Sequence, residues 1–152
     1  MRTLLTGLTV AVMTILLAPL AVIGTLLGLD RGAWSIPQFC MRTWARAACL
    51  AGGAHIVVHG REHMSLGRGT VYASNHVSWF DIFAIATVLP RYTFVAKSEL
   101  RRIPIFGWGA QGAGVIFLAR ENRKSAVEAY RGAAQQVRRG QCVVVCPEAV
   151  RY

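Results

Sequence analysis

A long uncharged stretch near the N-terminus limits most strongly how this chain can fold. Residues 4–29 contain no charged side chain and are bounded by Arg2 and Asp30. As one helix, this stretch would reach ~39 Å, more than the ~30 Å hydrocarbon core of a bilayer. Pro19 removes a backbone donor beyond the middle, so a helical hairpin is the alternative to one tilted transmembrane helix. We therefore predict that residues 1–31 form a membrane anchor, as one helix or a hairpin.

A cleaved signal peptide is the competing interpretation, because Arg2 precedes the apolar run and small residues stand at Ala18 and Ala21. The run continues to Leu29 without a convincing small-x-small cleavage site, which favours an anchor. The net charge of +10 comes from fifteen Arg and two Lys against seven acids. A basic surface attracts anionic lipid and nucleic acid alike. Because the chain has no zinc-finger spacing and no RNA-binding aromatic signature, we expect membrane lipid as a partner and no nucleic acid.

Strand and helix signals alternate in the rest of the chain. This alternation predicts an α/β domain over residues 32–152, with a largely parallel or mixed sheet flanked by helices. Residues 32–53 are amphipathic and place Arg42 and Arg46 one helical turn apart, as in an interfacial helix or one packed on the domain. The four cysteines lack metal-ligand spacing and are predicted to be buried, reduced thiols, with no metal site. The predicted strands are 55–59, 70–73, 92–96, 114–118 and 141–146, and the predicted helices are 79–89, 98–102 and 122–138.

A histidine stands five positions before an aspartate, directly after the predicted strand 70–73. His76 and Asp81 are the residue types of a general base and the carboxylate that orients it. On one continuous helix they would point ~140° apart, so the backbone must bend between them. Ser78 is a predicted helix N-cap and supplies that bend. The same Ser-x-x-Asp spacing is also a capping box, which is a purely structural explanation.

Two further strands end in residues that suit a phosphate. Arg120 follows strand 114–118, and Glu148 and Arg151 follow strand 141–146. The guanidinium fork is well shaped to hold a phosphate, although most arginines are solvated surface residues. Sites of α/β folds lie at the carboxyl ends of their strands, so these three residues are candidates for substrate binding.

These segments together resemble the glycerophospholipid acyltransferase family, whose best-known members are 1-acylglycerol-3-phosphate acyltransferases. His76 and Asp81 match its His-x4-Asp motif, and residues 114–120 resemble its second block, Gly-x-Ile-Phe-Ile-x-Arg. The third block, Phe-Pro-Glu-Gly-Thr-Arg, is matched at Pro147, Glu148 and Arg151, while Ala149 and Val150 replace its Gly and Thr. Since family members continue beyond this block and the chain ends one residue after Arg151, we expect a chain that is incomplete at its C-terminus.

The resemblance implies acyl transfer from acyl-CoA or acyl-carrier protein to a lysophospholipid hydroxyl, with 1-acylglycerol-3-phosphate as the first expected acceptor and lyso-ornithine lipid as another. His76 would be the base and Asp81 its orienter, and no cofactor besides the thioester co-substrate is expected. Arg120, Glu148 and Arg151 would shape the acceptor pocket. We expect a bacterial inner-membrane location with the site facing the cytoplasm. A catalytically inactive, lipid-binding membrane module is the alternative.

Overall fold

The computed structural model describes residues 1–30, 32, 35–64, 68–119 and 122–146. Its centre is a sheet with the strand order β1 (Val71–Ala73), β4 (Cys142–Val145), β2 (Tyr92–Lys97), β3 (Ile116–Leu118). The three described pairings are all parallel, with Val143 of β4 opposite both Val71 and Thr93. The predicted α/β class is therefore confirmed. Of the parallel and mixed arrangements that the sequence left open, the described strands have the parallel one.

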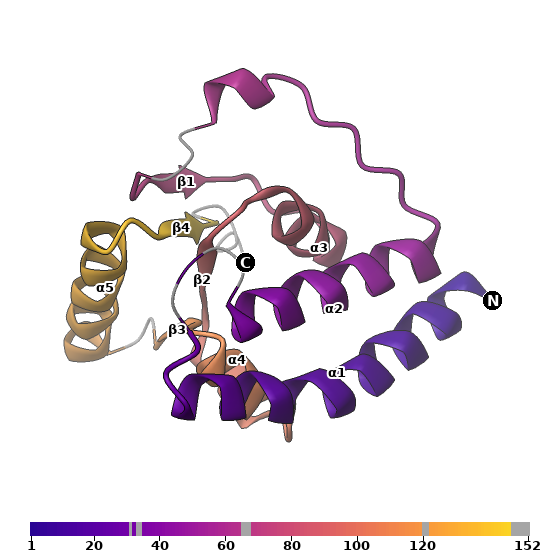
Figure 1. Cartoon of the computed structure of the whole chain (residues 1–152), viewed down its shortest axis with the longest axis horizontal. Coiled ribbons are helices and arrows are strands. Elements are labelled where there is room, and N and C mark those ends of the chain that lie inside the picture. Colours follow the sequence, from indigo (N-terminus) through magenta and orange to yellow (C-terminus); the bar gives the residue numbers. More distant parts are fainter. Residues whose placement is uncertain (31, 33–34, 65–67, 120–121, 147–152) are drawn as a thin grey trace.

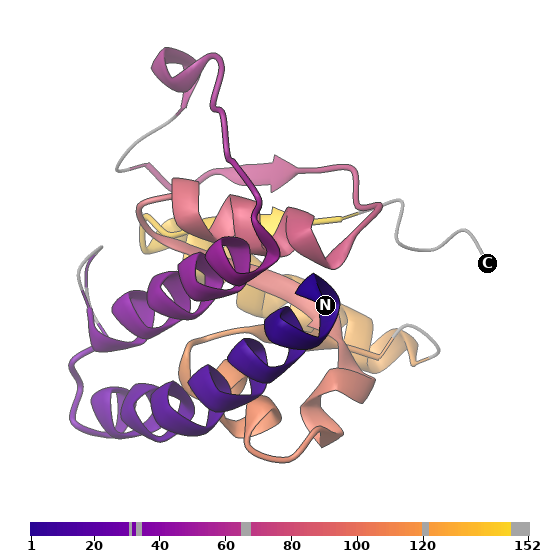
Figure 2. The same ribbon diagram turned by 90° about the vertical axis from the view of Figure 1, so that its right-hand side faces the viewer.

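Helices cover both faces of the sheet (Figures 1 and 2). One face carries α5, and the other carries α2 and α3. Helix α1 packs against both α2 and α4, and α4 also packs against η2. The core lies between α2, α3 and the sheet, where Tyr92 and Val144 are fully buried. The bounds of the helices are α1 (Arg2–Leu26), α2 (Ile36–Gly52), α3 (Trp79–Val88), α4 (Phe106–Gly112) and α5 (Arg123–Arg138), with the short 3-10 helices η1 (Arg61–His63) and η2 (Ser98–Arg102).

The predicted apolar stretch forms the single helix α1, which continues through Pro19. The structure thus has one helix here and not a hairpin within residues 2–26. It is the one helix among the described residues that is long and apolar enough to cross a membrane, by length and composition. It runs antiparallel to α2, because Gly24 lies against Ile36 while Arg2 lies beside Gly53. Small residues of α1 face the domain, and leucines face outward. The predicted domain boundary at residue 31 stays a prediction.

Two glycines allow α4 to lie directly on α1. A Cβ at Gly109 would overlap the side chain of Ala18, and one at Gly112 would come within 3.0 Å of the Val22 Cα. The Thr25 hydroxyl also donates a hydrogen bond to the Gly112 carbonyl. Close backbone approach of this kind needs small residues at the contact. The membrane-candidate helix is therefore an integral wall of the domain.

The structure corrects several expectations. Residues 55–59 form no strand, and helix α4 was not predicted. Of the two arrangements that the sequence left open for this helix, α2 has the one packed on the domain, with Arg42 buried and Arg46 exposed. All four cysteines are free, but only Cys40, Cys49 and Cys142 are buried, because Cys146 emerges at the end of β4.

Candidate active site

The carboxyl ends of β1, β4 and β2 meet at one edge of the sheet, where α/β folds usually place their sites. The chain leaves β1 and stays beside β4, since the Ser74 amide donates a hydrogen bond of 3.0 Å to the Val145 carbonyl. It then passes through His76 and enters α3 at Trp79. Lys97 ends β2 and Cys146 follows β4, so three chemically active side chains come from three strand ends.

The bend expected between His76 and Asp81 is present. Ser78 is the N-cap of α3 with extended dihedral angles (φ −143°, ψ 152°), and its hydroxyl accepts a hydrogen bond of 3.3 Å from the Phe80 amide. The Asp81 carboxylate turns back and accepts hydrogen bonds of 2.8 Å from the amides of Val77 and Ser78. This completes the capping box, so the structural explanation of the Ser-x-x-Asp spacing is confirmed.

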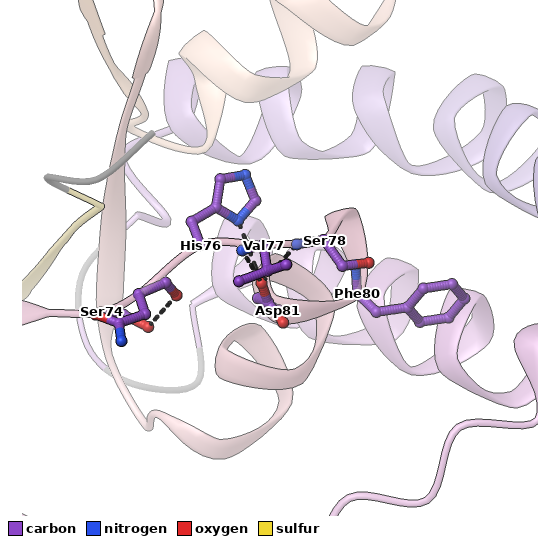
Figure 3. A network of polar contacts seen from close by, with 7 residues as sticks. Ser74, His76, Val77, Ser78, Phe80 and Asp81 are labelled. Carbon is purple, nitrogen blue, oxygen red and sulfur yellow. Dashed lines mark hydrogen bonds and ion pairs between the residues drawn. The ribbon is translucent and has the colours of Figure 1, made fainter. Parts of the chain in front are cut away.

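The same carboxylate also faces the imidazole. His76 Nδ1 lies 3.5 Å from Asp81 Oδ2, the oxygen that holds the two amides (Figure 3). This distance is long for a hydrogen bond, and the buried Nδ1 has no hydrogen-bond partner among the described residues. Figure 3 shows the other ring nitrogen, Nε2, pointing away from Asp81. The two side chains that the sequence paired therefore lie close together, while their catalytic roles stay a prediction. The oxygen that caps α3 is the one that faces the imidazole.

The helix terminus sets the charge of this carboxylate. The backbone hydrogen bond from Ser78, helped by that from Val77 and by His76, holds the pKa of Asp81 below its ordinary value of 3.8, against the opposing effect of partial burial. Amide donors and the positive end of the helix dipole both favour the anion. An anion fixed beside Nδ1 favours the tautomer that carries its proton there and leaves Nε2 free to accept one.

A largely apolar cavity of about 790 Å³ opens beside His76. This volume lies within the ~300–1,000 Å³ typical of small-molecule sites. Its wall also includes Lys97 and Cys146, whose thiol pKa is raised by burial and by the neighbouring Asp81 charge. The apolar wall comes from α1, α2, α3, β2 and α4, and includes Leu17, Met41, Trp44, Ile82, Phe94 and Phe106.

Not every candidate residue can be placed. Arg120, Glu148 and Arg151 lie outside the described residues, so their part in the site stays a prediction. Lys97 was given no role by the sequence reasoning, although it lines the cavity that His76 faces. The available signal was its position directly after the predicted strand 92–96, the same kind of position that drew attention to Arg120.

Known proteins are similar to this chain in sequence. The Acyltransferase family model matches residues 55–152. Lyso-ornithine lipid O-acyltransferase of Rhizobium meliloti is 31% identical over 147 residues, which cover 97% of this chain and 48% of that protein. The 1-acyl-sn-glycerol-3-phosphate acyltransferase of Neisseria gonorrhoeae is 39% identical over 90 residues, 59% of this chain and 35% of that protein.

A solved structure agrees with the sequence relatives. The crystal structure of the 1-acyl-sn-glycerophosphate acyltransferase PlsC from Thermotoga maritima matches with a TM-score of 0.64 and 25% identity, over 100% of this chain and 64% of that one. The chain therefore belongs to the acyltransferase family, as the motif residues indicated. It spans about half the length, or less, of the two curated relatives.

Proposed function

We propose that this protein transfers an acyl group from a thioester donor, acyl-CoA or acyl-carrier protein, to the hydroxyl of a lysophospholipid. The observation that carries the proposal is the His76–Asp81 pair at the wall of an apolar cavity, in a chain of the acyltransferase family. The pair supplies a base, and the cavity supplies a place for an acyl chain. Neither feature alone would distinguish an enzyme from a lipid-binding module.

In the proposed reaction, His76 Nε2 takes the proton of the acceptor hydroxyl as its oxygen attacks the thioester carbonyl. The carbon–sulfur bond then breaks, and the imidazolium returns the proton to the leaving thiolate. Asp81 holds His76 in the correct tautomer and stabilises the transient imidazolium. General-base help of this kind contributes ~10²–10⁴ in rate. No nucleophile of the chain is required, because the acceptor itself attacks the donor.

The cavity wall suits both ends of the substrates. Its aliphatic and aromatic side chains would hold an acyl chain, while Lys97 offers a positive charge for a phosphate near His76. Arg120, Glu148 and Arg151 remain proposed members of the acceptor pocket. We propose 1-acylglycerol-3-phosphate as the acceptor. Lyso-ornithine lipid is the second candidate, favoured by the relative that aligns over 97% of the chain.

A membrane location follows from the same chemistry, since donor chain, acceptor and product are all lipids. Helix α1 presents exposed leucines along its outer face and shares the cavity wall through Thr14, Leu17 and Ala18. A lipid-facing helix that also lines the cavity would bring the cavity close to the bilayer. We propose a bacterial inner-membrane location with the site facing the cytoplasm.

The proposal is tested with membranes that contain this chain, labelled acyl-CoA or acyl-carrier protein, and each of the two acceptors in turn. We expect labelled diacyl product with one acceptor, lost in His76→Ala. The matched control is His63→Ala, because the His63 side chain is 83% exposed on η1 and takes no part in the cavity. Equal labelling in wild type, His76→Ala and empty membranes would leave the inactive lipid-binding module as the better description.

A further inference from the structure

The sheet divides at the edge that carries His76. Strand β4 pairs with β1 as far as Val145, and β2 pairs with β3 as far as Lys97. The described pairing between β4 and β2 ends earlier, at Val144 and Phe94. Beyond this row the sheet continues as two separate strand pairs. A crevice at the carboxyl ends of parallel strands is where α/β sheets bind their ligands.

The side chains that follow this last shared row are small. Val144 and Phe94 belong to the core cluster between the sheet and helices α2 and α3. Because side chains alternate along a strand, the residues two positions further, Cys146 and Ala96, project to the same face of the sheet. Both line the cavity that also contains His76. Small side chains thus replace larger ones where the two strands part, and they form the floor of the cavity beside the proposed base.

Cys146 contributes to this floor through its size and not through its charge. Burial and the neighbouring charge of Asp81 raise the pKa of its thiol, so the side chain is neutral near pH 7. Cys146 directly precedes Pro147, at the position where the third motif block has Phe. A phenyl ring at this position would occupy space beside His76 that the thiol leaves open. The chain therefore has more room next to the proposed base than the motif itself specifies.

The two acceptors under consideration differ in the size of the polar head beside the reacting hydroxyl. In both, the hydroxyl-bearing carbon has a long chain on one side and a polar head on the other. The head is a phosphate in 1-acylglycerol-3-phosphate and a bulkier, amide-linked ornithine in lyso-ornithine lipid. Lys97 would pair with the phosphate of the first or with the carboxylate of the second, so its charge does not separate them. The room beside His76 does.

We propose that Cys146, together with Ala96, sets the size limit for the acceptor head and admits the amide-linked amino-acid head of a lyso-ornithine lipid beside His76. Cys146 is a specificity-determining residue and takes no part in the chemical step. The choice of acceptors rests on the proposed function. The size limit itself is measured by binding, which needs no turnover.

Titration of the purified protein with each lysolipid, without an acyl donor, tests the size limit. Trp44 and Trp79 line the cavity, so tryptophan fluorescence reports its occupation. We expect Cys146→Phe to raise the ratio of the Kd for lyso-ornithine lipid to the Kd for 1-acylglycerol-3-phosphate by at least about tenfold, because overfilling a pocket by even one methylene costs this much. Ala96→Val should shift the ratio in the same direction by less, and it replaces Cys146→Phe if that variant does not fold. Cys146→Ser keeps the small side chain and should keep the wild-type ratio.

Ala134→Phe is the matched control, because it adds the same ring on the exposed face of α5, away from the cavity. A ratio unchanged in both Cys146→Phe and Ala96→Val, or no binding of lyso-ornithine lipid to the wild type, would overturn the proposal. A shift in Cys146→Ser as large as that in Cys146→Phe would also overturn it, since size would then not be the cause. A chain that binds both lysolipids with these preferences and transfers no acyl group would keep the size limit and remove the proposed function.

Discussion

The two edges of the sheet use polar side chains in opposite ways. At the amino edge, Gln38 donates a hydrogen bond of 2.7 Å to the Tyr92 carbonyl and accepts one of 3.3 Å from the Tyr92 amide. Gln141 donates a second bond of 3.0 Å to the same carbonyl. At the carboxyl edge, His76 Nε2 makes no hydrogen bond within the described residues and lies at the wall of a cavity.

The polar side chains of the amino edge therefore stabilise the fold, whereas His76 at the carboxyl edge is the proposed functional group. Buried polar groups must be hydrogen-bonded, and Gln38 and Gln141 satisfy a strand end that packing leaves without partners. His76 Nδ1 only faces the Asp81 carboxylate at 3.5 Å, and neither ring nitrogen makes a hydrogen bond within the described residues. Asp81 combines both roles, because a single oxygen caps α3 and faces the imidazole. Substitutions at the two edges should therefore separate activity from stability.

His76→Ala should have the largest effect. Loss of the proposed base lowers acyl transfer by about 10²–10⁴-fold, with little change in the unfolding midpoint because the imidazole is partly exposed and makes no buried hydrogen bond. Initial rates of labelled product formation and thermal unfolding of the same preparations measure both. A fully active His76→Ala protein would remove the contrast between the two edges.

Asp81→Asn should have the second-largest effect. The amide oxygen can still accept from the Val77 and Ser78 amides, but the negative charge that favours the reactive tautomer of His76 is gone. We expect a loss of activity approaching that of His76→Ala and a loss of stability of about 1 kcal/mol at most. If the free energy of unfolding falls by more than this while activity per folded molecule is kept, Asp81 acts only as a helix cap.

Gln38→Leu should show the reverse pattern. It keeps the side-chain volume but leaves the Tyr92 amide without its acceptor, which costs about 1–3 kcal/mol in the free energy of unfolding. Acyl transfer per folded molecule should remain. Gln135→Leu on the exposed face of α5 is the matched control. Denaturant unfolding of both variants measures the difference. Equal stability of the two would contradict the stabilising role given to Gln38.

Ser78→Ala should have a smaller effect than Gln38→Leu. It removes the hydroxyl that accepts from the Phe80 amide but leaves both amide bonds to Asp81 in place. N-cap replacements cost about 0.5–2 kcal/mol, and the lower half of this range is expected here. The measurement is the unfolding midpoint beside the acyl-transfer rate. An activity loss as large as that of Asp81→Asn would show that the hydroxyl itself takes part.

The pH dependence of stability should give the smallest effect. The folded-state pKa of Asp81 lies below 3.8, so the unfolded chain binds more protons in the window just below that pH. This contribution is complete above the ordinary value and is lost as pH falls through the folded value. In that window, the unfolding midpoint of Asp81→Asn should depend less on pH than that of the wild type. Identical curves for both proteins would contradict the assignment.

The local part of the site was accessible from the sequence, because it is built from neighbours. The Ser78 cap, the turn back of Asp81 and the approach to His76 all lie within six residues and follow from capping chemistry. The place of Lys97 in the cavity wall was missed because distant elements form the cavity, among them Leu17 of α1 and Phe106 of α4. Helix α4 was missed because its glycines favour a turn, and only their contact with α1 shows why they are helical.

Local pattern determined the alternation of strands and helices, the helical character of the apolar stretch, and the cap of α3, since periodicity and capping act over one or two turns. Whether the apolar stretch is one helix or a hairpin was decided by the tertiary structure. Tertiary structure decided which polar groups are hydrogen-bonded within the fold and which face the cavity. It also decided that residues 55–59, whose three central side chains are β-branched and favour a strand, pair with none of the described strands. A strand forms only when a second backbone supplies its hydrogen bonds, and the segment's own composition cannot specify that partner.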